Sequence, residues 1–372
     1  MKRNLPSFAA CFCLIFFISS FSIATEKPVH KNPGDAISQL LKQEIPDGGP
    51  GIAVLVAKDD RVLFRGARGL ANIEWMVPAS PDHIFPIGSD TKTFVAATVL
   101  KLVECGKISL EDDLSKFLPN YPEASRIKIR QLLNHTSGVG DYTQTSGFFR
   151  TTAPLDTDTA NLIAQIEKLP MDFAPDERWA YSNSNYILLQ AVIGLITARP
   201  WALAVEETIL GPLGLSHTTY ADKTATRPMR ASGYQRDGEG SVRNAWHVSA
   251  SQTGASGGLE SNVDDLFVWL RALHTGKVLS PAHYWAMTSP RATSADRNIY
   301  GYGLWIETRK ARRVYWHGGR LPGFSSQMAY FPDQGITVIL LRNEDSGKPN
   351  LDNLVDRLFD ITVRHGLEWQ GS

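Results

Sequence analysis

The pair Ser89 and Lys92 has the residue types and the spacing of a nucleophile beside a base. Both stand where a loop runs into an apolar stretch of the chain. On a helix, residues i and i+3 share one face with Cβ atoms about 5–6 Å apart, so an amine there can touch a hydroxyl. A serine attacks well only after a base takes its proton, and a lysine can be that base once burial lowers its pKa. The spacing therefore predicts an activated serine.

A second Ser-x-x-Lys segment, Ser125 to Lys128, shows that the pattern alone does not decide. It stands in a charged, alternating stretch that is typical of a solvated surface segment. Ser89 is instead followed by apolar residues nearly all round the helical period, which indicates a buried helix. Lysine is rarely buried without a partner, so Lys92 at the start of such a helix needs a reason. Context therefore favours Ser89.

The hydrophobic pattern predicts strands at both ends of the chain and mainly helices between them. Near the N-terminus it predicts a helix over 33–45 and a hairpin of strands 51–57 and 61–68. Near the C-terminus it predicts four strands and a closing helix, over 300–307, 312–317, 325–331, 336–342 and 351–364. The economical fold for this pattern is mixed α and β, with the terminal strands joined in one antiparallel sheet that helices cover.

This arrangement divides the chain into two expected lobes. An α/β lobe would contain residues of about 30–105 and 295–368, and a helical lobe would contain residues of about 106–294. A cleft between two lobes is a common place for a binding site. We therefore expect the site between the sheet and the helical lobe.

Composition and the N-terminus indicate an exported globular protein with no electrostatic footprint for nucleic acid. The 372 residues are 43% hydrophobic and 20% charged, and Lys+Arg and Asp+Glu are both 38. Lys2 and Arg3 precede the apolar run Phe8–Ile23, which closes at Ala24. This is typical of a signal peptide over 1–24, which leaves a mature domain over 25–372, although an uncleaved anchor remains an alternative. We expect a periplasmic or extracellular protein with no membrane span after cleavage, and no internal disulfide because Cys105 is then its single cysteine.

Two further motifs carry groups that suit a catalytic site. Tyr181-Ser182-Asn183 is the only Tyr-x-Asn in the chain, and it precedes an apolar helical stretch over 187–196. His317-Gly318-Gly319 follows a predicted strand and is followed by Arg320. Glycines in such a place let a ligand approach the backbone closely.

In this order, the three motifs resemble those of the penicillin-recognising serine hydrolases. The tyrosine version is similar to the branch with class C β-lactamases, D-alanyl-D-alanine carboxypeptidases, D-amino-acid hydrolases and esterases. The resemblance covers about residues 35–345, with further similar stretches at 132–138, 211–215 and 257–261. It implies a β-lactamase/transpeptidase-like fold, in which an antiparallel sheet has helices on both faces as a three-layer αβα arrangement, with a helical lobe beside it.

The resemblance also implies a role for each motif. Ser89 would attack a carbonyl and form an acyl-enzyme, and Lys92 and Tyr181 would share proton transfer without either being assigned as the base. Asn183 would bind the substrate amide or Lys92. The oxyanion hole would be the backbone N–H groups of Ser89 and Arg320, on a substrate-binding strand that contains His317, Gly318 and Gly319. A small-molecule or peptide substrate is implied, with no cofactor and no metal, and the scattered His83, His135 and His217 are expected to be structural.

The third motif departs from the family pattern, which is usually Lys-Thr-Gly in relatives that destroy β-lactams. The threonine hydroxyl is absent, and the cation becomes dependent on pH because imidazole has an ordinary pKa of about 6.5. Arg320 offers a replacement charge. If His317 binds a carboxylate as a cation, affinity for anionic substrates falls between about pH 6 and 8. The motif favours a D-alanyl carboxypeptidase, a D-aminoacyl hydrolase or an esterase over a true β-lactamase.

Two other hypotheses compete with this one. Residues 254–258 match the Gly-x-Ser-x-Gly pattern of α/β-hydrolases, with Ser256 as nucleophile and Asp264 and His317 following in the right order. That pattern requires a buried strand directly before it, and residues 245–253 are too polar to form one. A non-catalytic penicillin-binding receptor module is the third hypothesis, against which the intact motifs argue.

Overall fold

The computed structural model describes Met1 and residues 32–222, 224–293 and 299–366. The expected signal peptide over 1–24, apart from Met1, lies outside the described residues. The central feature is an eight-stranded sheet in the order β10-β11-β12-β13-β14-β15-β1-β2. The bounds of its strands are β1 Ile52–Lys58, β2 Arg61–Arg68, β10 Ala292–Thr293, β11 Ile299–Tyr300, β12 Trp305–Arg309, β13 Arg312–Leu321, β14 Phe324–Phe331 and β15 Ile336–Arg342.

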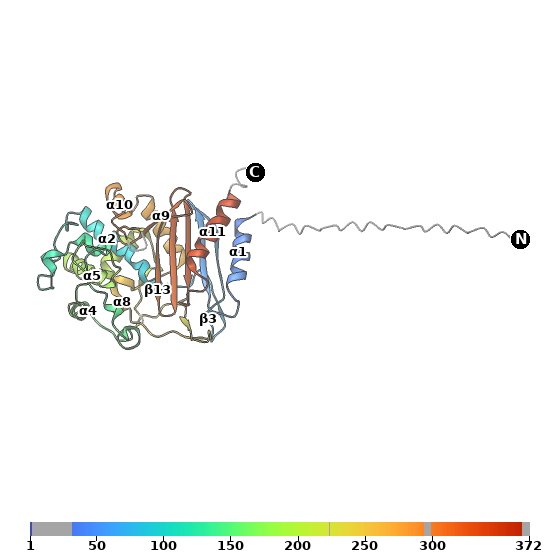
Figure 1. Cartoon of the computed structure of the whole chain (residues 1–372), viewed down its shortest axis with the longest axis horizontal. Helices are drawn as coiled ribbons and strands as arrows, with labels where there is room; N and C mark the ends of the chain where they lie inside the picture. The colour runs from blue at the N-terminus through green and yellow to red at the C-terminus, as the bar shows by residue number, and fades with distance from the viewer. Residues whose placement is uncertain (2–31, 223, 294–298, 367–372) are drawn as a thin grey trace.

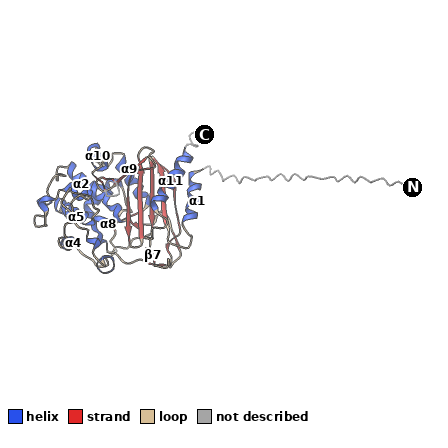
Figure 2. Ribbon diagram, viewed as in Figure 1, coloured by secondary structure: helices blue, strands red, loops and turns tan. Residues whose placement is uncertain are grey.

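Strands from the two ends of the chain pair with each other inside this sheet. β1 pairs antiparallel with β15 over seven residues, from Ile52 opposite Arg342 to Lys58 opposite Ile336. The other neighbouring strands are antiparallel as well. Every residue of β15 is buried, as its composition of aliphatic residues requires for an interior strand. The predicted antiparallel sheet of terminal strands is thus confirmed (Figure 2).

Helices cover both faces of the sheet, which confirms the expected three layers. α1 (Pro33–Glu44) and α11 (Leu351–Gly366) pack on one face, against one set of alternating sheet residues (Figure 1). α9 (Val263–His274) packs on the other face, against β1, β14 and β15. It falls inside the range expected for the helical lobe, yet its apolar side belongs to the sheet. The remaining helices are α2 Thr91–Glu104, α3 Ile129–Asn134, α4 Thr159–Ile166, α5 Asn183–Thr197, α6 Trp201–Val205, α7 Gly211–Leu213, α8 Ala250–Gly257 and α10 Pro281–Thr288.

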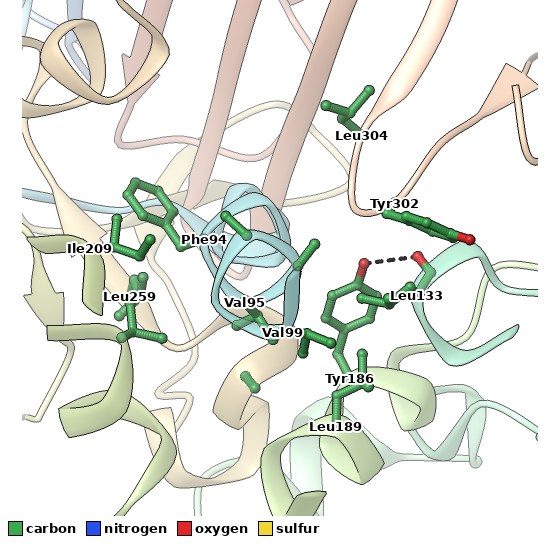
Figure 3. Packing of buried hydrophobic residues seen from close by; sticks show 14 of the residues in the cluster. Phe94, Val95, Val99, Leu133, Tyr186, Leu189, Ile209, Leu259, Tyr302 and Leu304 are labelled. Atoms are coloured by element: carbon green, nitrogen blue, oxygen red, sulfur yellow. Dashed lines mark hydrogen bonds between the residues drawn. The ribbon is translucent and has the colours of Figure 1, made fainter. Parts of the chain in front are cut away.

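α2 is the helix that the other helices surround. Its residues from Thr91 to Leu100 are buried, as the apolar pattern after Ser89 predicts. Figure 3 shows Phe94, Val95 and Val99 on this helix enclosed by residues of α5, of β9 (Leu259–Ser261) and of the segments around them. The hydroxyl of Tyr186 in α5 donates to the Leu133 carbonyl at 3.0 Å. Since α2 is packed on all sides, the residues at its start are held in fixed positions.

Three small sheets connect loops outside the eight-stranded sheet. β5 (Phe85–Pro86) and β6 (Thr219–Tyr220) pair with β9 (Leu259–Ser261), which places the segment before Ser89 beside the end of α8. The other two sheets are hairpins of two strands, β3 Leu70–Asn72 with β4 Val77–Pro78 and β7 Tyr234–Arg236 with β8 Val242–Asn244. The three-stranded sheet is the one that positions the turn at Ser89.

Two strand predictions need correction. The strand predicted over 300–307 is broken into β11 and β12, because residues 301–304 turn against neighbouring helices. A Cβ at Gly303, which has a φ of 75°, would lie 2.7 Å from the Lys92 carbonyl oxygen. β13 extends to Leu321, so His317 lies within a strand and not at its end. No single helix of the described residues is long and apolar enough to cross a membrane.

Candidate active site

Ser89 lies in a single 3-10 turn, Gly88–Asp90, that leads directly into α2. Gly88 has a φ of 50°, a left-handed conformation that glycine adopts at no steric cost. Ser89 is half-buried, so its hydroxyl can be reached from solvent, while Lys92 is completely buried one turn along. The Lys92 Nζ is 3.0 Å from the Ser89 Oγ. The structure therefore brings together the amine and the hydroxyl that the spacing predicts.

The Lys92 amine has two further partners, and both are oxygen acceptors. Its Nζ donates to Asn183 Oδ1 at 2.9 Å and to the Ser256 carbonyl at 2.7 Å. A neutral amine has two N–H groups and one lone pair. When the two acceptors occupy the N–H groups, the lone pair faces the Ser89 hydroxyl. This geometry can take the proton of Ser89.

The electrostatic surroundings of Lys92 suit that task. Burial lowers the pKa of Lys92 from 10.5 to about 7, although the negative charge of Asp141, and that of Asp90 whenever it is ionised, opposes the shift. A large fraction of the lysine is then neutral near pH 7. Burial acts in the opposite direction on Tyr181, where it raises the pKa of the phenol, opposed by a hydrogen bond with Ser89. Near neutral pH the lysine can therefore act as a base and the tyrosine as a proton donor.

Asn183 begins α5 and is oriented by two residues that the motifs did not reveal. Its Nδ2 donates to Asp141 Oδ2 and to Thr143 Oγ1, each at 3.1 Å. Thr143 in turn donates its hydroxyl to Asp141 Oδ1 at 2.9 Å. These contacts fix the amide so that Oδ1 faces Lys92. Asp141 and Thr143 stand about forty residues before Asn183 in the sequence. The only sequence signal that could have indicated them is their position shortly after the similar stretch 132–138.

Tyr181 places its ring over the lysine. The Lys92 Nζ is 4.8 Å from the centre of the Tyr181 ring. On the other side, the ring of His135 lies 4.4 Å from that of Tyr181. His135 Nδ1 is 3.3 Å from the backbone nitrogen of Ser182, which donates to it. His135, expected to be structural and scattered, is in fact buried directly behind the Tyr181-Ser182-Asn183 segment and holds it in place.

The free edge of β13 faces the turn at Ser89. β12 pairs with β13 only as far as Trp316, and beyond it β13 packs against the turn of residues 88–90. A Cβ at Gly88 would lie 2.9 Å from the Arg320 backbone nitrogen, and one at Gly319 would lie 1.8 Å from the Ile87 carbonyl oxygen. Gly319 is therefore required for this close approach. The backbone N–H groups of Ser89 and Arg320 stand on the two facing segments, as an oxyanion hole requires.

His317 cannot act as the expected pH-dependent cation. Its side chain is 2% exposed, and both ring nitrogens have partners. Nδ1 is 2.9 Å from the Gly318 carbonyl oxygen, which can only accept, so Nε2 accepts from the Tyr300 hydroxyl at 3.0 Å. Burial lowers the pKa of His317 to about 3. The expectation that this residue titrates between about pH 6 and 8 is therefore wrong, because burial holds it neutral throughout that range.

Arg320 does not supply the missing charge in this conformation. Its guanidinium donates to the carbonyl of Asp345, in the loop after β15. The side chain is exposed, and its backbone is the part that faces Ser89. Among the described residues of the three motifs, the only cation directed into the site is therefore Lys92, whose hydrogen atoms already have acceptors.

Comparison with known proteins identifies the family of the chain. The family model described as Beta-lactamase matches residues 37–361. The chain belongs to the beta-lactamase family. Its relatives include a putative penicillin-binding protein, PbpX, of Bacillus subtilis, which is 27% identical over 90% of this chain and 79% of that protein. A D-aminopeptidase of Gluconobacter oxydans is 28% identical, over 80% of this chain and 56% of that protein.

Solved structures of the family superpose on most of the chain. A D-stereospecific amidohydrolase from a Streptomyces species has a TM-score of 0.75 at 30% identity and covers 84% of this chain and 94% of its own. A penicillin-binding protein from Bacillus halodurans has a TM-score of 0.75 at 26% identity and covers 82% and 95%. The protein is a serine hydrolase of this fold, and the predicted family and fold are confirmed.

The competing nucleophile Ser256 does not have the surroundings of an α/β-hydrolase. Residues 250–257 form α8, so a helix stands where that hypothesis requires a strand. Ser256 is buried, and its hydroxyl donates to the Thr253 carbonyl at 2.6 Å. Asp264 binds Arg65, and His317 binds Tyr300, so these residues do not form a triad. Ser256 contributes to the beta-lactamase-family site through its carbonyl oxygen, which holds Lys92.

A cavity of about 330 Å³ adjoins the site, and its wall contains apolar residues as well as the ion pair of Arg230 with Glu260. Pro86 and Gly257 in its wall flank the turn at Ser89, and Leu321 directly follows Arg320. Its other apolar walls include Trp246, Val248, Pro322 and Phe324. A larger cavity of about 780 Å³ lies among α4, α5 and α6 and is lined by none of the motif residues. In the part of the chain that the structure describes, no group of three or more His, Cys, Asp or Glu side chains could hold a metal ion.

Proposed function

We propose that the protein hydrolyses D-aminoacyl amides through an acyl-enzyme, with a leaving group that carries no carboxylate. The observation that carries this proposal is the buried His317, both of whose ring nitrogens have hydrogen-bond partners, in the position where β-lactam-hydrolysing relatives have a lysine. A substrate carboxylate bound next to His317 would lose its hydration without gaining a cationic partner, which costs binding free energy. Carboxypeptidase and β-lactamase substrates are therefore disfavoured, and simple amides are accepted.

In the proposed mechanism, neutral Lys92 takes the proton of Ser89 as the hydroxyl attacks the substrate carbonyl. The backbone N–H groups of Ser89 and Arg320 stabilise the oxyanion. Tyr181, which keeps its proton near neutral pH, donates a proton to the leaving nitrogen and is restored through Lys92. Water then attacks the acyl-enzyme and releases the acid. Asn183 holds the lysine in register for both steps.

The preference for an aminoacyl group has two supports. The half-buried carboxylate of Asp141 adds negative charge behind Asn183, which favours a cationic amine in the substrate. The apolar part of the cavity wall, beside Leu321, suits an apolar or aromatic acyl side chain. The D configuration rests on the relatives described as a D-stereospecific amidohydrolase and a D-aminopeptidase.

A substrate panel tests the proposal. We expect kcat/KM for D-phenylalanine amide to exceed that for D-alanyl-D-alanine and nitrocefin by about 10- to 100-fold, because an unpaired charged group costs roughly 1.5–3 kcal/mol. We also expect it to exceed that for L-phenylalanine amide, because relatives are described as acting on D substrates. Release of ammonia, amine or chromophore is the measurement. A label from a fluorophosphonate should map to Ser89 by peptide mass spectrometry. Faster turnover of D-alanyl-D-alanine or nitrocefin than of the amide would refute the proposed substrate class, and no turnover together with no label would favour the receptor module.

Export of the protein is also proposed, on the basis of Lys2, Arg3 and the apolar run that closes at Ala24. A leader of this composition directs a chain across a membrane and is removed after small residues. We expect the mature protein to begin at Thr25 and to be recovered outside the cytoplasm. Intact mass of the purified native protein measures this, and a mass that includes residues 1–24 would indicate a retained anchor.

A further inference from the structure

Asp90, the residue after the nucleophile, has no role in the proposed mechanism, yet it is completely buried. Its Oδ2 is 2.6 Å from the Ser326 Oγ in β14. The same Ser326 Oγ is 2.9 Å from the Ile87 carbonyl oxygen, in the segment before Ser89. A chain of three polar groups thus connects the two ends of the nucleophile turn to the sheet.

The protons of this chain can be counted. Ser326 has one hydroxyl proton, and the Ile87 carbonyl can only accept. An ionised Asp90 can also only accept, so one of the two short contacts would then lack a proton. If Asp90 is protonated on Oδ2, it donates to Ser326, and Ser326 donates to Ile87. Only the protonated acid satisfies both distances.

The charged and titratable groups around Asp90 agree with this count. His317 on β13 is the nearest, with its Nδ1 4.0 Å from Asp90 Oδ1, and its proton is directed to Gly318. Lys92 on α2 has Ser89, Asn183 and Ser256 as partners and makes no hydrogen bond to Asp90. Oδ1 of Asp90 has no hydrogen-bond partner among the residues that the structure describes. Burial raises the pKa of Asp90 well above its usual value, against the opposing effects of its hydrogen bond with Ser326 and of the charge of Lys92.

We propose that Asp90 is a positioning residue that works as a neutral carboxylic acid, clamping the turn of Ser89 onto β14 and so fixing the oxyanion hole. This inference rests on the proposed acyl-enzyme function. The clamp acts on the correct elements, because Ser326 stands opposite Gly319 in the register and Gly319 precedes Arg320. The backbone donor of Ser89 is next to Asp90, which contacts Ser326, and the backbone donor of Arg320 is next to Gly319, which pairs with Ser326. A neutral Asp90 also leaves Lys92 without a buried counter-ion, which is compatible with its role as a base.

The proposal predicts that asparagine can replace Asp90 and that alanine cannot. The amide of Asp90→Asn has the shape of the protonated acid and can donate to Ser326, so kcat should stay within about threefold of wild type, with an unchanged pH profile. Asp90→Ala removes the donor and lets the turn move, so kcat should fall by about 10²-fold with a smaller change in KM. Thermal unfolding checks that each variant is folded. Equal losses in both variants would show that an ionised carboxylate is needed, and wild-type kinetics of Asp90→Ala would show that no clamp exists.

A measurement without substrate separates this inference from the proposed function. The carboxyl carbon of Asp90, labelled with ¹³C and assigned by its absence in Asp90→Asn, should show a protonated acid by NMR at neutral pH. Its signal should not move between about pH 5 and 8. A signal of an ionised carboxylate would overturn the inference even if the enzyme is active. If the signal is that of a protonated acid but the protein hydrolyses no amide, the inferred protonation state of Asp90 is supported and the proposed function is refuted.

Discussion

Replacing Ser89 with alanine is expected to lower kcat by about 10⁶-fold. A loss of this size follows when the nucleophilic serine is removed from a set of catalytic residues that act cooperatively. Ser89 is the hydroxyl that Lys92 contacts at 3.0 Å, and it faces the backbone edge of β13. No other serine contacts that amine through its hydroxyl among the described residues. Turnover of D-phenylalanine amide and fluorophosphonate labelling measure the loss.

Two other serines provide the comparison. Ser125 is exposed and belongs to the second Ser-x-x-Lys segment, so Ser125→Ala should keep wild-type kinetics. Ser256→Ala keeps the backbone carbonyl that binds Lys92 and loses only a hydroxyl directed at Thr253, so it should keep most of its turnover. An inactive Ser256→Ala beside an active Ser89→Ala would restore the α/β-hydrolase hypothesis.

Replacing Lys92 with methionine is expected to lower kcat by about 10²- to 10⁴-fold, the usual contribution of a general base. Methionine has a similar length and suits a buried site, so folding should be retained while the lone pair is lost. Lys101 lies on the same helix and pairs with Glu104 at its partly exposed end, which makes Lys101→Met a matched control with near wild-type kinetics. Comparable losses in the two variants would mean that damage to α2, and not loss of a base, explains the result.

The pH profile of the wild type provides the second measurement on Lys92. Protonated Lys92 cannot take a proton from Ser89, and the neutral form increases as pH rises through its pKa of about 7. We therefore expect kcat/KM for a neutral ester to rise with pH and to reach half its limit near that pKa. Lys92→Met should lose this limb. A wild-type rate that is constant from about pH 5.5 to 8.5 would exclude Lys92 as the base.

The sequence was sufficient for the parts of the site that local patterns encode. Helical spacing places Lys92 against Ser89, and the apolar residues after them bury α2. The aliphatic run over 336–342 predicts an interior strand, which β15 is. In each case the burial or the contact depends on the spacing of residues that are close together in the sequence. That spacing can be recognised without knowing which distant segments pack against them.

The parts that local patterns missed depend on segments that meet only in the folded chain. Tyr300 reaches His317 from β11, which β12 separates from β13 in the sheet order, and Asp141 reaches Asn183 from a distant loop. The protonation of His317 could not be predicted because burial by the whole fold, and not the residue type, sets its pKa. The break in the strand predicted over 300–307 has the same origin, because the backbone at Gly303 turns where it closely approaches the backbone of α2.

The pairing of β1 with β15 has a consequence for the time at which the enzyme becomes active during synthesis. Ser89 and Lys92 leave the ribosome early, whereas Arg320 and the strand that clamps the nucleophile turn are among the last segments made. Contacts between the ends of a chain form slowly, because a long loop must close first. A nascent or truncated chain that stops before β13 therefore contains the nucleophile and its base but lacks half of the oxyanion hole. We therefore expect such a chain to lack the proposed amidase activity until the sheet is closed.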